Sequence, residues 1–271
     1  MTTFLAAVRY EFRMQLRKRS VWLVPALILV MILMIGGSLL RDLFEPAPGE
    51  ADPKQTMILL GLQLQAVLPI GYGCLLADRL IRDDRLRVAP VLDATPSRPG
   101  LRLLGKYLGA AAATAVPIIL IYAGLTTAYS VYYGQPAALG WAAVCFGVVM
   151  LPGLLFVAAF ALAVPLVMPA PLFRVLFVGY WLWGNLAPPE VMPTLANTVI
   201  QPVGGYAING VLNHYGADGD LVTAGPVAGA TLNFLRPDPT ALAGWLSIAI
   251  LLALAAAALA SGQALRTLRT R

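Results

Sequence analysis

The chain has 271 residues, of which 59% are hydrophobic and only 12% are charged. Soluble domains carry about 25% charged residues, roughly twice this share. The charges are also bunched, because residues 107–173 contain no Asp, Glu, Lys or Arg. A soluble fold of this stretch would lack charge for its surface, so the composition excludes an ordinary soluble domain and favours an integral membrane protein.

We expect a single all-α membrane domain over residues 1–271, with six transmembrane helices. A helix that crosses the hydrocarbon core needs about 20 apolar residues. Six segments meet this requirement, namely 21–40, 56–77, 107–130, 142–165, 170–188 and 242–264. The fifth segment is short and carries Arg174, but an arginine near a helix end can extend to the lipid headgroups.

Charge predicts the orientation of these spans. With the N-terminus in the cytoplasm, all but three of the 19 Lys and Arg residues lie on the cytoplasmic side, the exceptions being Arg41, Lys54 and Arg236. Short loops rich in Lys and Arg stay in the cytoplasm. We therefore expect a protein of the cell inner (cytoplasmic) membrane with both termini in the cytoplasm. An odd number of spans would place the basic C-terminus outside.

Residues 1–20 have the pattern of an amphipathic helix at the membrane surface. Two stripes recur every four residues: Phe4, Val8, Phe12 and Leu16 are apolar, and Arg9, Arg13 and Arg17 are basic. Such a helix lies in the interface, with its apolar face toward the acyl chains and its arginines toward anionic headgroups. Membrane lipid is therefore an expected partner, and a plain basic flank to the first span is the alternative.

The cytoplasmic loop over residues 78–106 combines charges with interleaved apolar residues. Opposite charges stand four residues apart in the pairs Asp78/Arg82, Arg79/Asp83 and Asp83/Arg87. Such pairs support a helix, which we expect to continue out of the bilayer and to end at Pro90. This loop is either a solvated connector or a docking surface for a cytoplasmic partner.

Residues 189–241 form the expected external segment. Its stretch 191–217 carries no Asp, Glu, Lys or Arg but contains amides such as Asn197, Gln201 and Asn209. Irregular backbone and polar groups at membrane depth must be shielded by protein or water. We therefore expect an external cap or re-entrant helices before the sixth span.

Few polar residues fall inside the spans. Gln63, Gln65 and Tyr72 in the second span and Asn185 in the fifth are candidates for lining a pathway, and pairing between helices is the alternative. No span holds a clear buried Asp, Glu, Lys or His, which argues against an ion-coupled pump. The single histidine, His214, cannot form a two-histidine metal site, and catalytic motifs are absent. We expect neither a metal site nor an enzyme by itself.

Two short phrases complete this layout: Leu92-Asp93-Ala94-Thr95-Pro96-Ser97-Arg98 in the loop and Gly105-Lys106-Tyr107-Leu108-Gly109 at the third span. With the basic N-terminal helix, the six spans and the external segment, they resemble the permease subunits of type-2 ABC exporters. In that family the loop often carries a Gly-Thr-Leu element, then a Leu-x-x-Thr-Pro phrase with a following Arg, then a Gly-Lys entering the third span. Here Arg85-Leu86-Arg87-Val88 stands in place of the Gly-Thr-Leu element.

The resemblance implies one half of an ATP-driven exporter. A second permease, identical or different, would pair with this chain, and two cytoplasmic ABC ATPase subunits would bind Mg-ATP. This chain itself would need no cofactor, and no nucleic acid is expected as a partner. The second and fifth spans would line the pathway. The loop would be the coupling helix that docks on the ATPase, through Arg79, Arg82, Asp83, Asp84, Arg85, Arg87, Val88, Leu92, Thr95 and Pro96.

The apolar spans favour a hydrophobic or amphipathic substrate, such as a drug, an antimicrobial peptide or a lipid-like molecule. Two other classes stay open. A secondary transporter would carry titratable groups in its spans and inverted repeats, and neither is visible. A non-transporting membrane anchor or assembly subunit is the class that the sequence excludes least well.

Overall fold

A computed structural model describes residues 2–35, 52–81, 99–214 and 224–269. In this part of the chain the regular structure is helical and contains no strand. Four helical segments are long and apolar enough to cross a membrane, namely Pro53–Leu76, Gly100–Tyr133, Ala137–Leu166 and Ala241–Leu268. The expectation of an all-α, multi-pass membrane protein is therefore confirmed.

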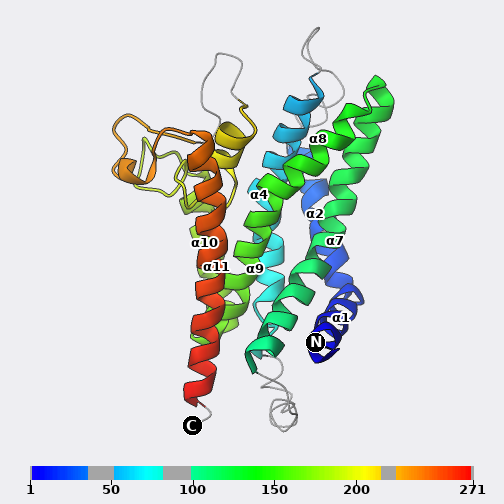
Figure 1. The fold of residues 1–271 in the computed structure, drawn as a ribbon, viewed down its shortest axis with the longest axis vertical. Helices are drawn as coiled ribbons and strands as arrows, with labels where there is room; N and C mark the ends of the chain where they lie inside the picture. Colours follow the sequence, from blue (N-terminus) through cyan, green and yellow to red (C-terminus); the bar gives the residue numbers. More distant parts are fainter. Residues whose placement is uncertain (1, 36–51, 82–98, 215–223, 270–271) are drawn as a thin grey trace.

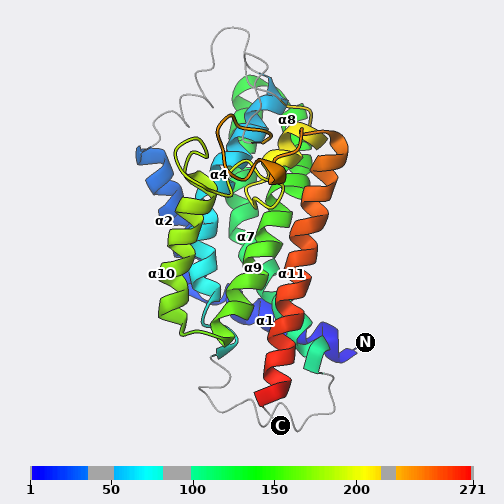
Figure 2. The same cartoon turned by 90° about the vertical axis from the view of Figure 1, so that its left-hand side faces the viewer.

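The long helices run side by side along the longest axis of the molecule, whereas α1 (Thr2–Leu16) lies across one end of the bundle (Figures 1 and 2). In chain order the bundle contains α2 (Arg19–Ile35), α4 (Pro53–Leu76), α7 (Pro99–Tyr133), α8 (Ala137–Cys145), η1 (Phe146–Met150), α9 (Leu151–Ala163), η2 (Val164–Leu166), α10 (Ala170–Trp181), η3 (Leu182–Leu186) and α11 (Ala241–Arg269). The segments α8, η1, α9 and η2 follow one another without a break and form one membrane-length rod.

The expected spans agree unevenly with these helices. The second, third, fourth and sixth fall on the four membrane-length segments. The first and fifth fall on α2 and on α10 with η3, which are shorter. The third helix begins at Pro99, well before the predicted start at residue 107, and proline is tolerated in the first turn of a helix.

The central helix of the bundle is α4, which contacts α2, α7, α8, α9 and α10. Its residues Leu60, Leu64, Leu68, Tyr72 and Leu76 are all buried. Residues four apart in a helix share one face, so a continuous stripe of α4 forms the core. Any movement of α4 therefore changes the packing of most of the bundle.

The fourth spanning segment widens locally into the π turn η1, just before Pro152. Proline has no N–H, and its ring clashes with the carbonyl group four residues earlier. The regular α-helical bond cannot form there, and a π turn accommodates the extra width. Phe146–Met150 thus offers a surface where another segment can insert, and Gly204 of the outer region lies against it: a Cβ at Gly204 would come within 2.6 Å of Val149 Cγ1.

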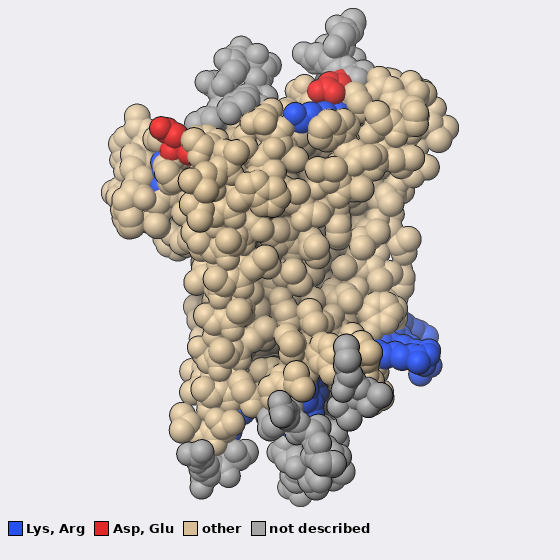
Figure 3. Space-filling view, viewed as in Figure 1, with Lys and Arg blue, Asp and Glu red and all other residues tan. Residues whose placement is uncertain are grey.

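We call the end of the bundle that carries α1 the basic end, and the end that carries residues 187–214 and 224–240 the cap end. Both α1 and the C-terminal turns of α11 lie at the basic end (Figure 1). On the face seen in Figure 3, a broad band without charged side chains separates the charged groups at the two ends. A bilayer requires such a band, because charges in its core are costly.

The cap differs from the sequence expectation. Its only helical pieces among the described residues are the single turns η4 (Ala207–Val211) and η5 (Asn233–Leu235), so the expected cap helices are largely replaced by turns. Positive φ angles at Gly204, Gly225 and Gly229 reverse the chain there, a conformation that glycine adopts without strain.

Candidate functional site

The candidate site is the turn that follows α4, which we call the anchor turn (residues 77–80). It begins the loop over residues 78–106 that the sequence marks as a docking surface. Three consecutive residues of the turn are held by three other helices: Asp78 by α10, Arg79 by α1 and Leu80 by α11.

The strongest of these contacts is the buried ion pair between Arg79 and Glu11 of α1. The Arg79 Nη2 atom donates to Glu11 Oε2 at 2.6 Å, and Arg79 Nε donates to Glu11 Oε1. Gln15, one turn further along α1, donates its Nε2 to Glu11 Oε1 at 3.1 Å. The two charged side chains are only 4% and 2% exposed. A planar guanidinium that meets a carboxylate through two nitrogens fixes orientation as well as distance.

The other two contacts are more open to solvent. Arg174 of α10 pairs with Asp78 through its Nη2 atom and donates its Nε to the carbonyl oxygen of Cys74 at 3.1 Å. Its side chain is 39% exposed and that of Asp78 is 43% exposed, so this pair contributes little energy. Arg266 of α11 donates to the carbonyl oxygen of Leu80 at 3.1 Å. These two contacts position the anchor turn and contribute little to the stability of the fold.

The same helix α1 also lies closely against the start of α7. A Cβ at Gly109 would come within 2.6 Å of the carbonyl oxygen of Val8, and one at Gly105 within 2.9 Å of Ala7 Cβ. Glycines four residues apart allow two helix backbones to approach closely. Thus α1 joins the start of α7, at the end of the loop, to the anchor turn, at its beginning.

The coupling residues predicted from the sequence divide into two groups. Arg79 lies in the site, where it is buried, pairs with Glu11 and positions the turn, and Asp78 pairs with Arg174. The expected pairs of Arg79 with Asp83 and of Asp78 with Arg82 involve residues outside the described part of the chain. The remaining predicted residues lie outside the described part of the chain: Arg82, Asp83, Asp84, Arg85, Arg87, Val88, Leu92, Thr95 and Pro96.

The predicted interface helix is present as α1. The sequence pattern predicted its apolar and basic stripes, but not which residues would be buried against the bundle. Arg9, Arg13 and Arg17 are exposed, and Phe12 and Leu16 are half-buried. The most buried side chains of α1 are instead the polar residues Glu11 and Gln15.

Glu11, Arg174 and Arg266 are the site residues that sequence reasoning missed as ion-pair or hydrogen-bond partners. A signal existed for the first, because Glu11 is the only acid before Asp42. A lone acid beside an apolar stripe, in a segment that is otherwise basic, points to a buried partner of opposite charge.

Of the predicted pathway residues, Gln65 and Asn185 lie under the cap. Gln65 donates its Nε2 to the carbonyl oxygen of Pro202 at 3.1 Å, and a Cβ on Gly153 would come within 2.1 Å of that Nε2 atom. The carbonyl oxygen of Asn185 accepts from Gln201 Nε2 at 3.0 Å. The cap therefore covers both residues.

The other two predicted pathway residues lie elsewhere on α4. Tyr72 shares the face of Gln65, two turns further along, and its hydroxyl is buried with no hydrogen-bond partner at normal distance among the described residues. Gln63 is half-buried and, two residues from Gln65, lies on a different face. Gln65 and Tyr72 thus form one polar track on the central helix, and Gln63 is not part of it.

The cap is held by one buried arginine, Arg236, which is 1% exposed. Its Nη2 donates to the carbonyl oxygens of Thr194 and Ala196 at 2.8 and 3.0 Å, and its Nε donates to Ala196 at 3.1 Å. Backbone carbonyl groups bind two of its three nitrogens, whereas Nη1 is buried with no partner among the described residues. Arg236 thus ties the two halves of the cap together.

Two further observations complete the description. Among the described residues no group of three or more His, Cys, Asp or Glu could hold a metal ion. Neither a family model nor a curated protein sequence matches the chain.

Proposed function

We propose that this chain is the permease subunit of an ATP-driven exporter of the type-2 ABC kind, and that the anchor turn transmits movement of the cytoplasmic loop to the spanning helices. A separate ATPase subunit binds and hydrolyses Mg-ATP. The substrate is hydrophobic or amphipathic, in keeping with the apolar spans.

The observation that carries the proposal is the convergence of α1, α10 and α11 on three consecutive residues of the anchor turn. A solvated connector needs no such attachment. A loop that transmits force does need this attachment, because the force moves other helices only if the loop is rigidly joined to them. Rigid helices and polar networks are the physical carriers of such coupling.

The proposed membrane arrangement has six spans in the inner membrane, with the basic end in the cytoplasm. In it α2 and α10 with η3 are the two shorter spans. Exposed apolar side chains on their outer surfaces support this assignment: Leu23, Leu27 and Val30 on α2, and Leu172, Val175 and Leu176 on α10. Apolar residues facing outward are what a lipid environment favours.

Transport itself requires a pathway, which we place between two permease chains, identical or different. Gln65 and Tyr72 of α4 are buried within the bundle in this structure, so they line the pathway only in a state in which the bundle opens. The cap contact between Gln65 and Pro202 then closes the track at the cap end, and opening requires this hydrogen bond to break. One such bond contributes about 1 kcal/mol, small enough for ATP-driven switching.

The test is to replace Asp83, Asp84 and Arg85 together by alanine, in the full complex reconstituted into vesicles. We expect normal insertion and an ATPase that still co-purifies, but substrate-stimulated ATP hydrolysis reduced at least tenfold. The matched control is Asp52→Ala, which removes an acidic cap at the other end of α4.

A replacement of residues 82–98 by glycine and serine gives the second arm. If transport continues with this loop, the coupling role is wrong. If no ATPase co-purifies with the unaltered chain, the protein is a secondary transporter or a membrane anchor instead.

A further inference from the structure

The helix α1 presents a surface that neither the bundle nor the anchor turn uses. Its inner face is fixed by Glu11, Gln15 and the close contact with Gly109. Because that face cannot rotate without breaking a buried ion pair, the direction of the opposite face is also fixed.

The opposite face carries Arg9, Arg13 and Arg17, all exposed. Residues four apart rise about 6 Å along a helix and share one side, so the three guanidinium groups form a row. None of the three forms an ion pair within the described part of the chain. The only acid of α1, Glu11, lies on the inner face and is already paired with Arg79.

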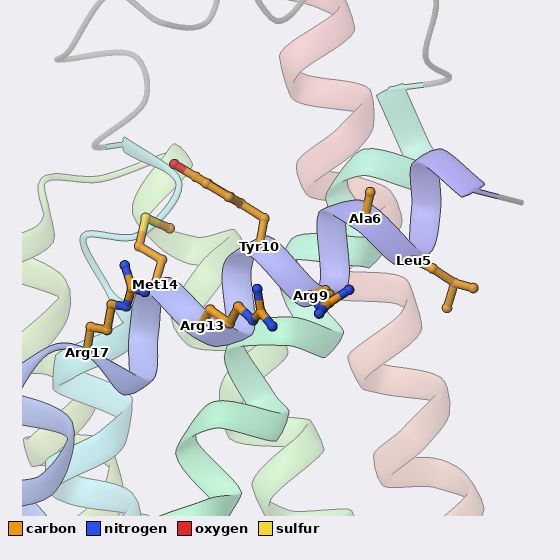
Figure 4. A pocket seen from close by; sticks show the side chains of 7 residues that line it. All are labelled: Leu5, Ala6, Arg9, Tyr10, Arg13, Met14 and Arg17. Atoms are coloured by element: carbon orange, nitrogen blue, oxygen red, sulfur yellow. The ribbon is translucent and has the colours of Figure 1, made fainter.

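Figure 4 shows how these side chains lie. Arg9, Arg13 and Arg17 follow one another along α1, and Tyr10 and Met14 project from the neighbouring side. Together with Leu5 they line an open hollow of about 840 Å³. Tyr10 is 69% exposed and Leu5 is 59% exposed, so apolar and aromatic surface adjoins the cationic row.

The level of this row relative to the membrane follows from Trp22. Its indole Nε1 donates to the carbonyl oxygen of Leu16 at 2.9 Å and its ring is 40% exposed. Tryptophan is enriched at the boundary between acyl chains and headgroups. Because Trp22 closes the corner between α1 and α2, it places the nearby arginine row at headgroup level.

We propose that Arg9, Arg13 and Arg17, with Tyr10 and Leu5 beside them, form a binding site for anionic phospholipid. The guanidinium groups bind lipid phosphates through paired hydrogen bonds, and the exposed Leu5 contacts the upper acyl chain. An unbalanced row of three cations discriminates against zwitterionic headgroups, whose ammonium groups it repels. An acidic protein surface would satisfy the charge but would not explain exposed leucine and tryptophan at the same level.

This proposal does not depend on transport, so it can be tested on the isolated chain. The protein is reconstituted into phosphatidylcholine vesicles that contain phosphatidylglycerol. Electron paramagnetic resonance of spin-labelled lipids then measures the relative affinity for the two headgroups. We expect a preference for phosphatidylglycerol that weakens as salt is added, since exposed charges are screened.

Replacing Arg13 by glutamine should lower the relative affinity about fivefold, and replacing all three arginines should abolish the preference, because each basic group at the surface contributes about 1 kcal/mol. The control is Lys54→Gln, which removes the same charge at the cap end, where Lys54 lies 5.2 Å from the Trp141 ring centre. It should leave the preference unchanged.

One result would overturn the proposal, namely that the triple variant keeps the phosphatidylglycerol preference of the unaltered protein. If that variant, expressed in cells, also no longer co-purifies with a cytoplasmic partner, the row is a protein-docking surface instead. The single Arg13→Gln variant decides the question if the triple variant does not fold.

Discussion

The Glu11–Arg79 pair dominates the basic end at the scale of single residues. Both charges are removed from water, which costs several kcal/mol per ion unless geometry and hydrogen bonds compensate. Here Gln15 supplies an additional bond to the carboxylate. The pair thus specifies one position of α1 on the anchor turn, whereas the exposed Asp78–Arg174 pair adds little to stability.

Removing one partner of this pair leaves the other buried and uncompensated. We expect Glu11→Ala to destabilise the protein by about 3–5 kcal/mol. The double variant Glu11→Ala with Arg79→Met should recover most of that loss, because an apolar pair needs no compensation. The measurement is the thermal unfolding of each variant in detergent. Asp78→Ala is the control, and the role assigned to the pair fails if it destabilises the protein as much as Glu11→Ala.

The sequence could not reveal this pair, for a physical reason. Charge patterns predict partners three or four residues away on one helix, and Glu11 and Arg79 are 68 residues apart. The lone acid in a basic segment shows that a partner is needed. Only the packing of α1 against α7 and the anchor turn shows which arginine it is.

At the scale of elements, the helices were predictable because their apolar length is itself the signal. The predicted spans over 56–77 and 242–264 nearly match α4 and α11. The start of α7 was harder to predict, because residues 99–106 are polar enough to resemble a loop. Yet this early start adds Gly105, one turn before Gly109 of the predicted span, to the helix that receives α1.

Substituting Gly109 tests that junction. An alanine Cβ there would lie 2.6 Å from the Val8 carbonyl oxygen, so we expect Gly109→Ala to displace α1. The matched control is Gly124→Ala on the same helix, where no other described element comes within 4 Å of the added Cβ. In that variant the better helix propensity of alanine should stabilise the helix by up to about 1 kcal/mol.

Limited trypsin digestion gives the measurement, since Arg13 on α1 and Arg17 directly after it are exposed cleavage sites. We expect cleavage there to accelerate several-fold in Gly109→Ala and to stay unchanged in Gly124→Ala. Equal protection in both variants would show that α1 does not depend on close approach to α7.

At the scale of the whole molecule, the bundle was predictable and the cap was not. Spans can be predicted from hydropathy, because lipid requires apolar side chains and an internally hydrogen-bonded backbone along every exposed segment. The cap has no such periodic constraint. Its turns are set by contacts such as those of Arg236 with Thr194 and Ala196, about forty positions earlier. The sequence predicted that amides in residues 191–217 would be shielded, and Gln201 and Asn209 are buried. It did not predict that turns would surround them.

The orientation in the membrane is the last point that the fold makes testable. With six spans and a cytoplasmic basic end, Tyr10 and Leu268 face the cytoplasm and Phe234 faces outside, and all three are exposed. Single cysteines at these positions, in a chain whose Cys74 and Cys145 are replaced by alanine, can be labelled with a membrane-impermeant maleimide. In intact cells we expect labelling at position 234 alone, and in inverted vesicles at positions 10 and 268. Labelling of 10 and 234 from the same side would contradict the arrangement, because the bundle separates them. Labelling of 10 and 268 in intact cells would invert it, and the arginine row of α1 would then face the outer leaflet.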